Sequence, residues 1–157
     1  MYILKVDKNE FTENGEKKEF WGYALYDNTT CIKKEVIKAR CYDTDTRVMR
    51  YIRCYTWALE RILGYFSVNN VQIDEISIYF TNQNIIKWIQ SGDVNKIYRL
   101  AIDKILGYID SIPVDTVNIC QANRNWMFRN MLNEASIKKS KNNNYMKLAD
   151  LINSVEV

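Results

Sequence analysis

Residues 44–66, TDTRVMRYIRCYTWALERILGYF, decide the fold because they show the clearest helical repeat in the chain. Apolar side chains recur every three or four positions and share one face of a helical wheel: Val48, Tyr51, Ile52, Tyr55, Leu59, Ile62, Leu63 and Phe66. The opposite side carries Arg47, Arg50, Arg53, Trp57 and Arg61. Asp43, Thr44 and Asp45 supply side chains that cap such a helix, and Gly64 predicts an end slightly before Phe66.

Three strands are predicted before this helix, over 2–7, 20–26 and 30–39, from their apolar and β-branched composition. Asn14-Gly15 and Asp27-Asn28 are turn signals that separate them. The N-terminal part of the chain is therefore predicted to form a meander of three antiparallel strands.

After the long helix, strands and helices alternate. The predicted order is a strand at 75–80, helices at 82–90 and 94–112, a strand at 115–120, and helices at 126–138 and 145–154. The side chains expected on the buried face of the 94–112 helix are Ile97, Ala101, Ile105, Tyr108 and Ile109. A meander followed by strand–helix–strand units predicts an α/β fold, with a five-stranded mixed sheet, helices on both faces, and one domain over 1–157.

Composition excludes several classes of function. The chain has 157 residues and no histidine, which excludes Ser-His-Asp and Cys-His catalysis and histidine-ligated zinc. No apolar run approaches the roughly 20 residues of a membrane helix, so no membrane partner is expected. The start of the sequence does not resemble a secretory signal, and no pair among the four cysteines has C-x-x-C spacing. These features predict reduced structural thiols and a cytoplasmic protein.

Positive charge is concentrated in two segments, although the net charge of the chain is only +3. Residues 33–61 carry 8 basic and 4 acidic side chains, and residues 121–157 carry 6 and 3. The two segments could meet in space and attract a polyanion, or they could belong to an ordinary mixed surface. Charge alone does not decide between these interpretations.

Four sequence features follow one another in the order of a known fold. Asp7 ends the first strand, Gly22-Tyr23 lies near the start of the second, Ala58-Leu59-Glu60-Arg61-Ile62 closes the long helix, and Ile78-Tyr79-Phe80-Thr81-Asn82-Gln83 leads to Lys87-Trp88-Ile89. In this order they resemble the ribonuclease H-like fold over nearly the whole chain. The resemblance implies two divalent ions, Mg²⁺ or Mn²⁺, held by about four carboxylates that activate water and stabilise the leaving oxygen.

The resemblance places these carboxylates at the end of the first strand, in the first turns of the first helix, at the end of the fourth strand and on the final helix. Asp7 matches the first position. The helix position falls near Arg50 or Tyr51, which do not bind magnesium, and Glu60 is expected on the surface away from Asp7. At the end of the fourth strand, Asn82 stands where the resemblance implies an aspartate.

Two acids are candidates for the last position. Glu134 lies four residues after Asn130, a spacing that resembles the family's, whereas Asp150 lies in an Ala-Asp-Leu context further along the chain. The candidate catalytic set is therefore Asp7, Asn82, Glu134 and Asp150, with Asp7 and Asp150 as ligands if a metal is bound. A set this incomplete predicts slow or absent hydrolysis.

Three functions are compatible with these features. The first is binding of RNA, DNA or their hybrid, with nuclease activity weak or lost. The predicted contacts with nucleic acid are Arg50, Arg53, Trp57, Arg61 and Arg124. The rim of the active-site groove that the resemblance implies is expected to carry Asn82, Gln83, Asn123 and Asn125. The second is an active, divalent-metal-dependent nuclease that uses Asp7, Glu134 or Asp150, and a third acid such as Glu10. The third is a factor of phage or mobile-element type that binds a protein partner and uses the fold as a scaffold. A solvated helix face is the alternative interpretation of the arginines.

Overall fold

The computed structural model describes residues 1–123 and 128–141, which form a sheet covered by helices. The strands are β1 (Tyr2–Glu13), β2 (Glu16–Asp27), β3 (Thr30–Lys38), β4 (Ile73–Phe80) and β5 (Val114–Gln121). The helices are α1 (Arg47–Asn69), α2 (Gln83–Ser91), the 3₁₀ turn η1 (Lys96–Tyr98) and α3 (Arg99–Asp110). Residues 128–141 are also helical. Among the described helices, none is both long enough and apolar enough to cross a membrane.

The five strands lie in the order β3-β2-β1-β4-β5 and form the predicted mixed sheet. β1 pairs antiparallel with β2, and β2 with β3, which confirms the predicted meander. β4 pairs parallel with β1 on one side and with β5 on the other. Because β1, β4 and β5 run in the same direction, the edge of the sheet beyond their carboxyl ends is the expected place for a ligand.

The β1–β2 hairpin is longer than the apolar pattern predicts. Pairing continues beyond Asp7 as far as Glu13 and Glu16. Asn14 and Gly15 have positive φ values of 52° and 77°, as a two-residue hairpin turn of this sequence requires. Charged side chains stabilise this extension through cross-strand ion pairs, which an apolar pattern does not detect.

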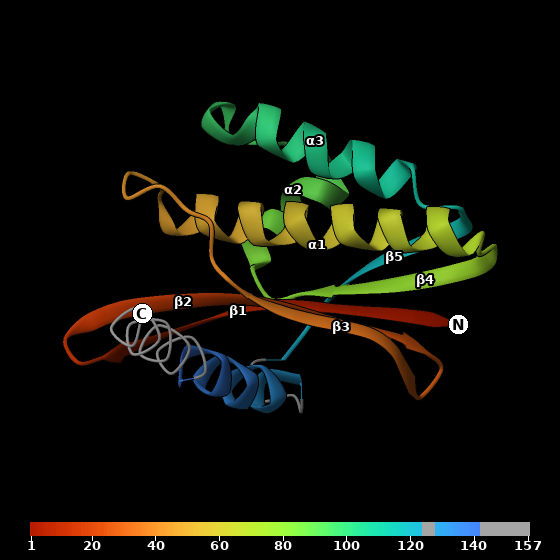
Figure 1. Cartoon of the computed structure of the whole chain (residues 1–157). Helices are drawn as coiled ribbons and strands as arrows, with labels where there is room; N and C mark the ends of the chain where they lie inside the picture. The colour runs from red at the N-terminus through yellow and green to blue at the C-terminus, as the bar shows by residue number, and fades with distance from the viewer. Residues whose placement is uncertain (124–127, 142–157) are drawn as a thin grey trace, which may run out of the picture.

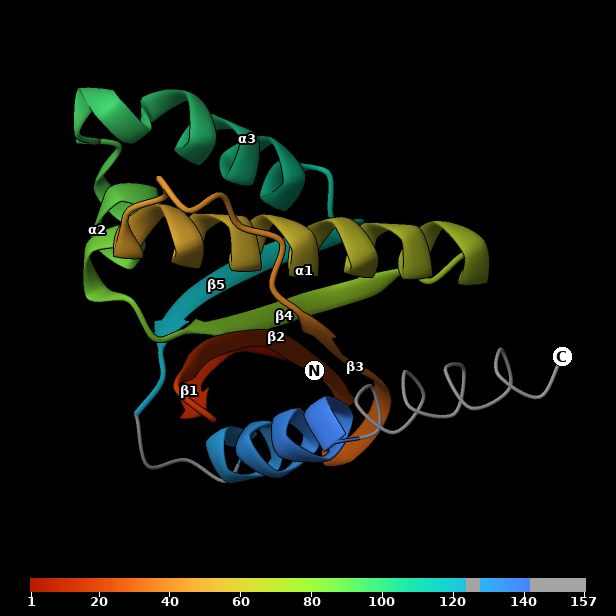
Figure 2. The ribbon, with the colours of Figure 1, turned by 60° about the vertical axis from the view of Figure 1, so that its left-hand side comes forward.

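Helices cover both faces of the sheet, as predicted. α1, α2 and α3 lie on one side, and the helix of residues 128–141 lies on the other, beside β1, β2 and β3 (Figure 1, Figure 2). The main core packs α1 against the first face through buried residues such as Ile52 and Leu59. A smaller cluster on the second face consists of Ala24, Phe128 and Leu132.

α1 begins and ends later than predicted. Its N-cap is Thr46, whose Oγ1 accepts a hydrogen bond from the Met49 backbone N–H at 3.1 Å. Asp45, predicted as part of the cap, instead forms an ion pair with a residue further along the helix. Gly64 does not end the helix, because the C-cap is Asn70 in the left-handed conformation, with φ of 49°.

The predicted helix over 94–112 is divided into η1 and α3. Asn95 caps η1, since its Oδ1 accepts a hydrogen bond from the Ile97 backbone N–H at 3.2 Å. Ile97 is 80% exposed, which corrects the prediction that it faces inward, whereas Ile105 and Ile109 are buried as expected. The predicted helix over 145–154 lies outside the described residues.

Candidate functional site

A groove opens at the edge of the sheet where the parallel strands end. β1 and β4 are paired from Tyr2 and Ile76 to Lys5 and Tyr79, after which β1 continues into the long hairpin and β4 leads into α2. The groove has a volume of about 850 Å³. It is lined by Asp7, Arg47, Val48, Tyr51, Thr81, Asn82, Gln83, Asn84, Gln121, Ala122, Asn123 and Arg129. This edge is the usual ligand site of open α/β sheets.

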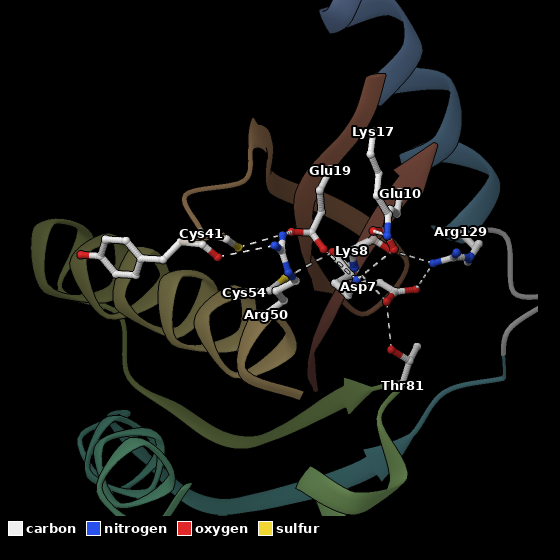
Figure 3. Close-up of polar contacts among 11 residues, drawn as sticks. Asp7, Lys8, Glu10, Lys17, Glu19, Cys41, Arg50, Cys54, Thr81 and Arg129 are labelled. Atoms are coloured by element: carbon white, nitrogen blue, oxygen red, sulfur yellow. Dashed lines mark hydrogen bonds and ion pairs between the residues drawn. The ribbon is translucent and has the colours of Figure 1, made fainter. Parts of the chain in front are cut away.

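Asp7 is 1% exposed, and both of its carboxylate oxygens are hydrogen-bonded (Figure 3). Oδ1 accepts from the Lys8 backbone N–H at 2.8 Å and from the Thr81 hydroxyl at 2.9 Å. Oδ2 accepts from Nη1 of Arg129 at 2.7 Å, and the same nitrogen donates to the Lys8 carbonyl at 2.7 Å. The negative charge of Asp7 is therefore balanced by a guanidinium.

Tyr55 of α1 fixes the junction between β4 and α2. Its hydroxyl oxygen accepts hydrogen bonds from the backbone N–H groups of Thr81 at 3.2 Å and Asn82 at 3.0 Å. It also lies 3.3 Å from Thr81 Oγ1, and because the Thr81 hydroxyl donates to Asp7, Tyr55 is the donor in this contact. Burial raises the pKa of Tyr55, so its hydroxyl stays protonated.

Replacing Tyr55 with phenylalanine is expected to lower the free energy of unfolding by about 2 kcal/mol, because two backbone N–H groups lose their acceptor. The ring is expected to stay stacked on Phe80, where the centroids are 4.1 Å apart. Urea unfolding measures the change. Tyr51→Phe is the matched control, since the Tyr51 hydroxyl makes no hydrogen bond within the described part of the chain. Equal losses in the two variants would contradict the assignment.

Asn82 lines the same groove as Asp7 and begins α2. Its Oδ1 accepts a hydrogen bond from the Ile85 backbone N–H at 3.1 Å, which makes it the N-cap of the helix. Asparagine is among the preferred N-cap residues. The structure thus brings two of the predicted site residues together and gives Asn82 a capping role.

The described residues do not fit a divalent metal ion in this groove. Mg²⁺ and Mn²⁺ prefer several anionic or carbonyl oxygens, and Asp7 is the only acid among the described residues that line the groove. Both of its oxygens already accept hydrogen bonds, one of them from a cation. Within residues 1–123 and 128–141, no three Asp, Glu, His or Cys side chains are arranged to hold a metal.

A second charged network lies beside Asp7 (Figure 3). Lys8 is 4% exposed, and its Nζ lies 2.7 Å from Oε1 of Glu19. The other Glu19 oxygen lies 3.4 Å from Nη1 of Arg50 and accepts a hydrogen bond from the Cys41 thiol at 3.3 Å. Burial and the nearby carboxylate raise the pKa of Cys41 to about 12, so this thiol is neutral and unreactive.

The arginines of α1 that were predicted to bind nucleic acid form ion pairs within the protein. The pairs are Arg50–Glu19 at 3.4 Å, Arg53–Asp45 at 2.7 Å and Arg61–Glu35 at 2.8 Å. Trp57 packs its ring against Trp21 and Tyr23, with centroid distances of 6.1 and 5.2 Å. None of these four side chains is among the described groove residues. They attach α1 to β2 and β3 and to its own N-terminal loop. Their contact with nucleic acid stays a prediction.

The remaining predicted residues lie elsewhere. Glu134 is exposed on the 128–141 helix and is not among the described residues that line the groove. Gln83 and Asn123 line the groove, as expected for its rim. The predicted positions that fall outside the described residues are Arg124, Asn125 and Asp150.

Two guanidinium groups that line the described part of the groove are absent from the predicted contact set. Arg47 is the first residue of α1, is exposed, and lies 5.9 Å from the centroid of the Tyr51 ring. Within the described residues it has no acidic partner, unlike the three arginines that follow it on α1. Its position at the N-terminus of α1 is the signal that could have placed it at the groove. Arg129 has no such local signal.

Comparison with known proteins gives similarity in structure only. No family model matches the sequence, and no curated protein is similar to it in sequence. LC11-RNase H1, isolated from compost by a metagenomic approach, has a TM-score of 0.61 at 14% identity, over 88% of this chain and 96% of that one. The structure of the same protein in complex with an RNA/DNA hybrid has a TM-score of 0.59 at 14% identity, over 79% of this chain and 86% of that one.

RNase H1 from the halophilic archaeon Halobacterium salinarum NRC-1 gives a TM-score of 0.53 at 14% identity, over 78% of this chain and 86% of that one. At these identities the likeness concerns the arrangement of strands and helices, which agrees with the sheet order and the helices on both faces. The chain therefore has the ribonuclease H-like fold.

Proposed function

We propose that this protein binds nucleic acid in the groove and that its nuclease activity is weak or lost. The observation that carries this proposal is the 2.7 Å ion pair between Asp7 and Arg129. It neutralises the only acid among the described groove residues, while the guanidinium of Arg47 adds a positive charge. A positively charged groove attracts a phosphodiester backbone, whereas hydrolysis with two metal ions needs clustered acidic ligands.

The lining groups suit sugar and phosphate oxygens better than stacked bases. Amide side chains that offer donors and acceptors are those of Gln83, Asn84 and Gln121. Tyr51 is the aromatic side chain among the described groove residues, and its ring centroid has Lys8 Nζ at 4.6 Å and the Arg47 guanidinium at 5.9 Å, so cations already lie against the ring. Binding is therefore expected to depend on the backbone more than on the base sequence.

Further support comes from the fold and the cysteines. LC11-RNase H1 is solved with an RNA/DNA hybrid, which favours nucleic acid as the class of ligand. The proposal treats residues 1–157 as one nucleic-acid-binding domain. All four cysteines are free thiols, which favours a cytoplasmic location.

An electrophoretic experiment tests the proposal. Labelled RNA–DNA hybrid, duplex RNA, duplex DNA and single strands are incubated with the protein in Mg²⁺, Mn²⁺ or EDTA and run on native and denaturing gels. Shifted, uncleaved bands that weaken steeply with salt would support binding without hydrolysis. Cleavage that needs metal and is lost in Asp7→Asn would establish a nuclease instead. If the protein neither shifts nor cleaves any of these nucleic acids, the proposal is ruled out and a protein partner is favoured.

Arg47→Gln is expected to weaken oligonucleotide binding by roughly three- to tenfold, because one exposed phosphate contact is lost. Fluorescence anisotropy with a labelled oligonucleotide measures the affinity. Lys104→Gln removes the same charge from α3, where Lys104 Nζ lies 5.8 Å from the centroid of the Tyr108 ring, and serves as the control. A similar loss in both variants would show that overall charge, and not the groove, determines binding.

A further inference from the structure

We infer that the guanidinium of Arg129 takes the place that a divalent ion has in a carboxylate–metal site. Asp7 holds the guanidinium, and the remaining N–H groups of Arg129 bind a phosphodiester oxygen without any metal. This inference rests on the proposed function, because it names the group that contacts the nucleic acid. It makes Asp7 a positioning residue for a cation that belongs to the chain.

Arg129 has donors left over after its contacts with the described residues. A guanidinium carries five N–H donors, and in the described part of the chain only Nη1 is hydrogen-bonded, to Oδ2 of Asp7 and to the Lys8 carbonyl, both at 2.7 Å. The side chain is 32% exposed and lines the groove, and no described residue accepts a hydrogen bond from Nε or Nη2. The planar fork of arginine matches two oxygens of one phosphate.

The surrounding structure holds this guanidinium in place. Asp7 is 1% exposed, and its second oxygen is fixed by the Thr81 hydroxyl at 2.9 Å. Gly22 lies directly opposite Asp7 in the β1–β2 ladder, and a Cβ there would lie 2.5 Å from Cδ1 of Leu132, on the same helix as Arg129. The absence of this Cβ lets the helix approach the sheet. A cation held in position before binding loses little conformational entropy when the ligand arrives.

The same contacts disfavour a divalent ion. Such an ion would have to displace Arg129 from Oδ2 and the Thr81 hydroxyl from Oδ1 of Asp7. The described lining supplies no second carboxylate to share the ion. The affinity for an oligonucleotide is therefore expected to agree within about threefold between EDTA and Mg²⁺ at matched ionic strength.

The first test is Mn²⁺ binding by the wild-type protein without nucleic acid, measured by electron paramagnetic resonance. The spectrum of free aqueous Mn²⁺ loses intensity when the ion binds to protein. No saturable binding is expected below about 1 mM Mn²⁺. A tighter site that Asp7→Asn removes would overturn the inference, whether or not the protein binds nucleic acid.

The second test is oligonucleotide affinity in EDTA. Arg129→Gln is expected to weaken binding about tenfold or more, which corresponds to the loss of one charge-assisted hydrogen bond. Arg129→Lys is expected to weaken binding by a smaller factor, because lysine keeps the charge but lacks the planar fork. Lys104→Gln is again the control. Should Arg129→Gln fail to fold, the double variant Asp7→Asn/Arg129→Gln removes both charges together, and the same weakening is expected.

The outcomes separate the two proposals. Wild-type binding in EDTA together with unchanged affinity in Arg129→Gln would overturn the role of Arg129 and leave the proposed function standing. Binding that appears only with Mg²⁺ would also overturn the inference. Failure of the wild-type protein to bind any of the four nucleic acids in any buffer would overturn the proposed function itself.

Discussion

Gly22→Val is expected to lower the free energy of unfolding by about 3 kcal/mol, because the 128–141 helix can no longer dock on the sheet. Gly22 faces this helix, and a Cβ at its position would lie 2.5 Å from Cδ1 of Leu132. The same Cβ would already be 3.4 Å from Cγ2 of Val36, so the branches of valine have no free direction on this face. Displacement of the helix also moves Arg129, and oligonucleotide binding is expected to weaken with stability.

Urea unfolding measures the stability change, and fluorescence anisotropy in EDTA measures the affinity. Gly22→Ala is expected to cost only about 1 kcal/mol, because the end of the Leu132 side chain can turn away. Gly107→Ala in α3 is the matched control, since an added Cβ meets nothing within 4 Å there, and stability is expected to rise by up to about 1 kcal/mol. Unchanged stability and affinity in Gly22→Val would contradict the close packing of this helix.

Asp7→Ala is expected to lower the free energy of unfolding in EDTA by about 3 kcal/mol. The substitution removes the acceptor of three donors, namely Arg129 Nη1, the Thr81 hydroxyl and the Lys8 backbone N–H. It also leaves a partly buried guanidinium without its anion. A carboxylate within a cluster of acids behaves in the opposite way, since its removal relieves repulsion among like charges when no metal is bound.

The sign of the change in the free energy of unfolding distinguishes an Asp7 that is paired with Arg129 from an aspartate in a cluster of acids. Asp7→Asn is expected to lose less stability than Asp7→Ala, because the amide oxygen still accepts hydrogen bonds. Glu134→Ala removes an exposed acid from the 128–141 helix and is expected to change stability by no more than about 0.5 kcal/mol. An Asp7→Ala protein more stable than the wild type in EDTA would be incompatible with a structural ion pair at this position.

The order of strands and helices was predictable because each element has a local signature. The apolar repeat of residues 44–66 identifies α1, and the Asn14-Gly15 turn identifies the first hairpin. Parallel pairing of the later strands follows from the helices between them. These features are sufficient for the mixed sheet with helices on both faces.

The ends of the elements depend on individual polar contacts, which a pattern does not contain. The charged end of β1 pairs through contacts such as Lys8–Glu19 at 2.7 Å. The start of α1 depends on Asp45, whose hydrogen bond and ion pair with Arg53 lower its pKa and leave Thr46 to cap the helix.

The positions of Asp7 and Asn82 in the candidate site were predictable, whereas the ion pairs of its arginines were not. Strand ends locate Asp7 and Asn82, because the carboxyl ends of parallel strands form the ligand edge of such sheets. Arg50 seemed available in the sequence because Glu19 is 31 residues away on β2. Arg129 is 122 residues from Asp7, so no local pattern indicates that they form an ion pair.

The salt dependence of binding tests most directly whether the guanidiniums of Arg47 and Arg129 hold phosphates. A fluorescein-labelled oligonucleotide of the type shifted in the gels is titrated in EDTA at several KCl concentrations with wild-type protein and with Arg47→Gln/Arg129→Gln. Each phosphate contact contributes about 0.7 to 0.9 to the slope of log affinity against log salt. The double variant is predicted to bind more weakly, with a slope shallower by roughly 1.4 to 1.8. Equal slopes and equal affinities in the two proteins would contradict a metal-free phosphate site in this groove.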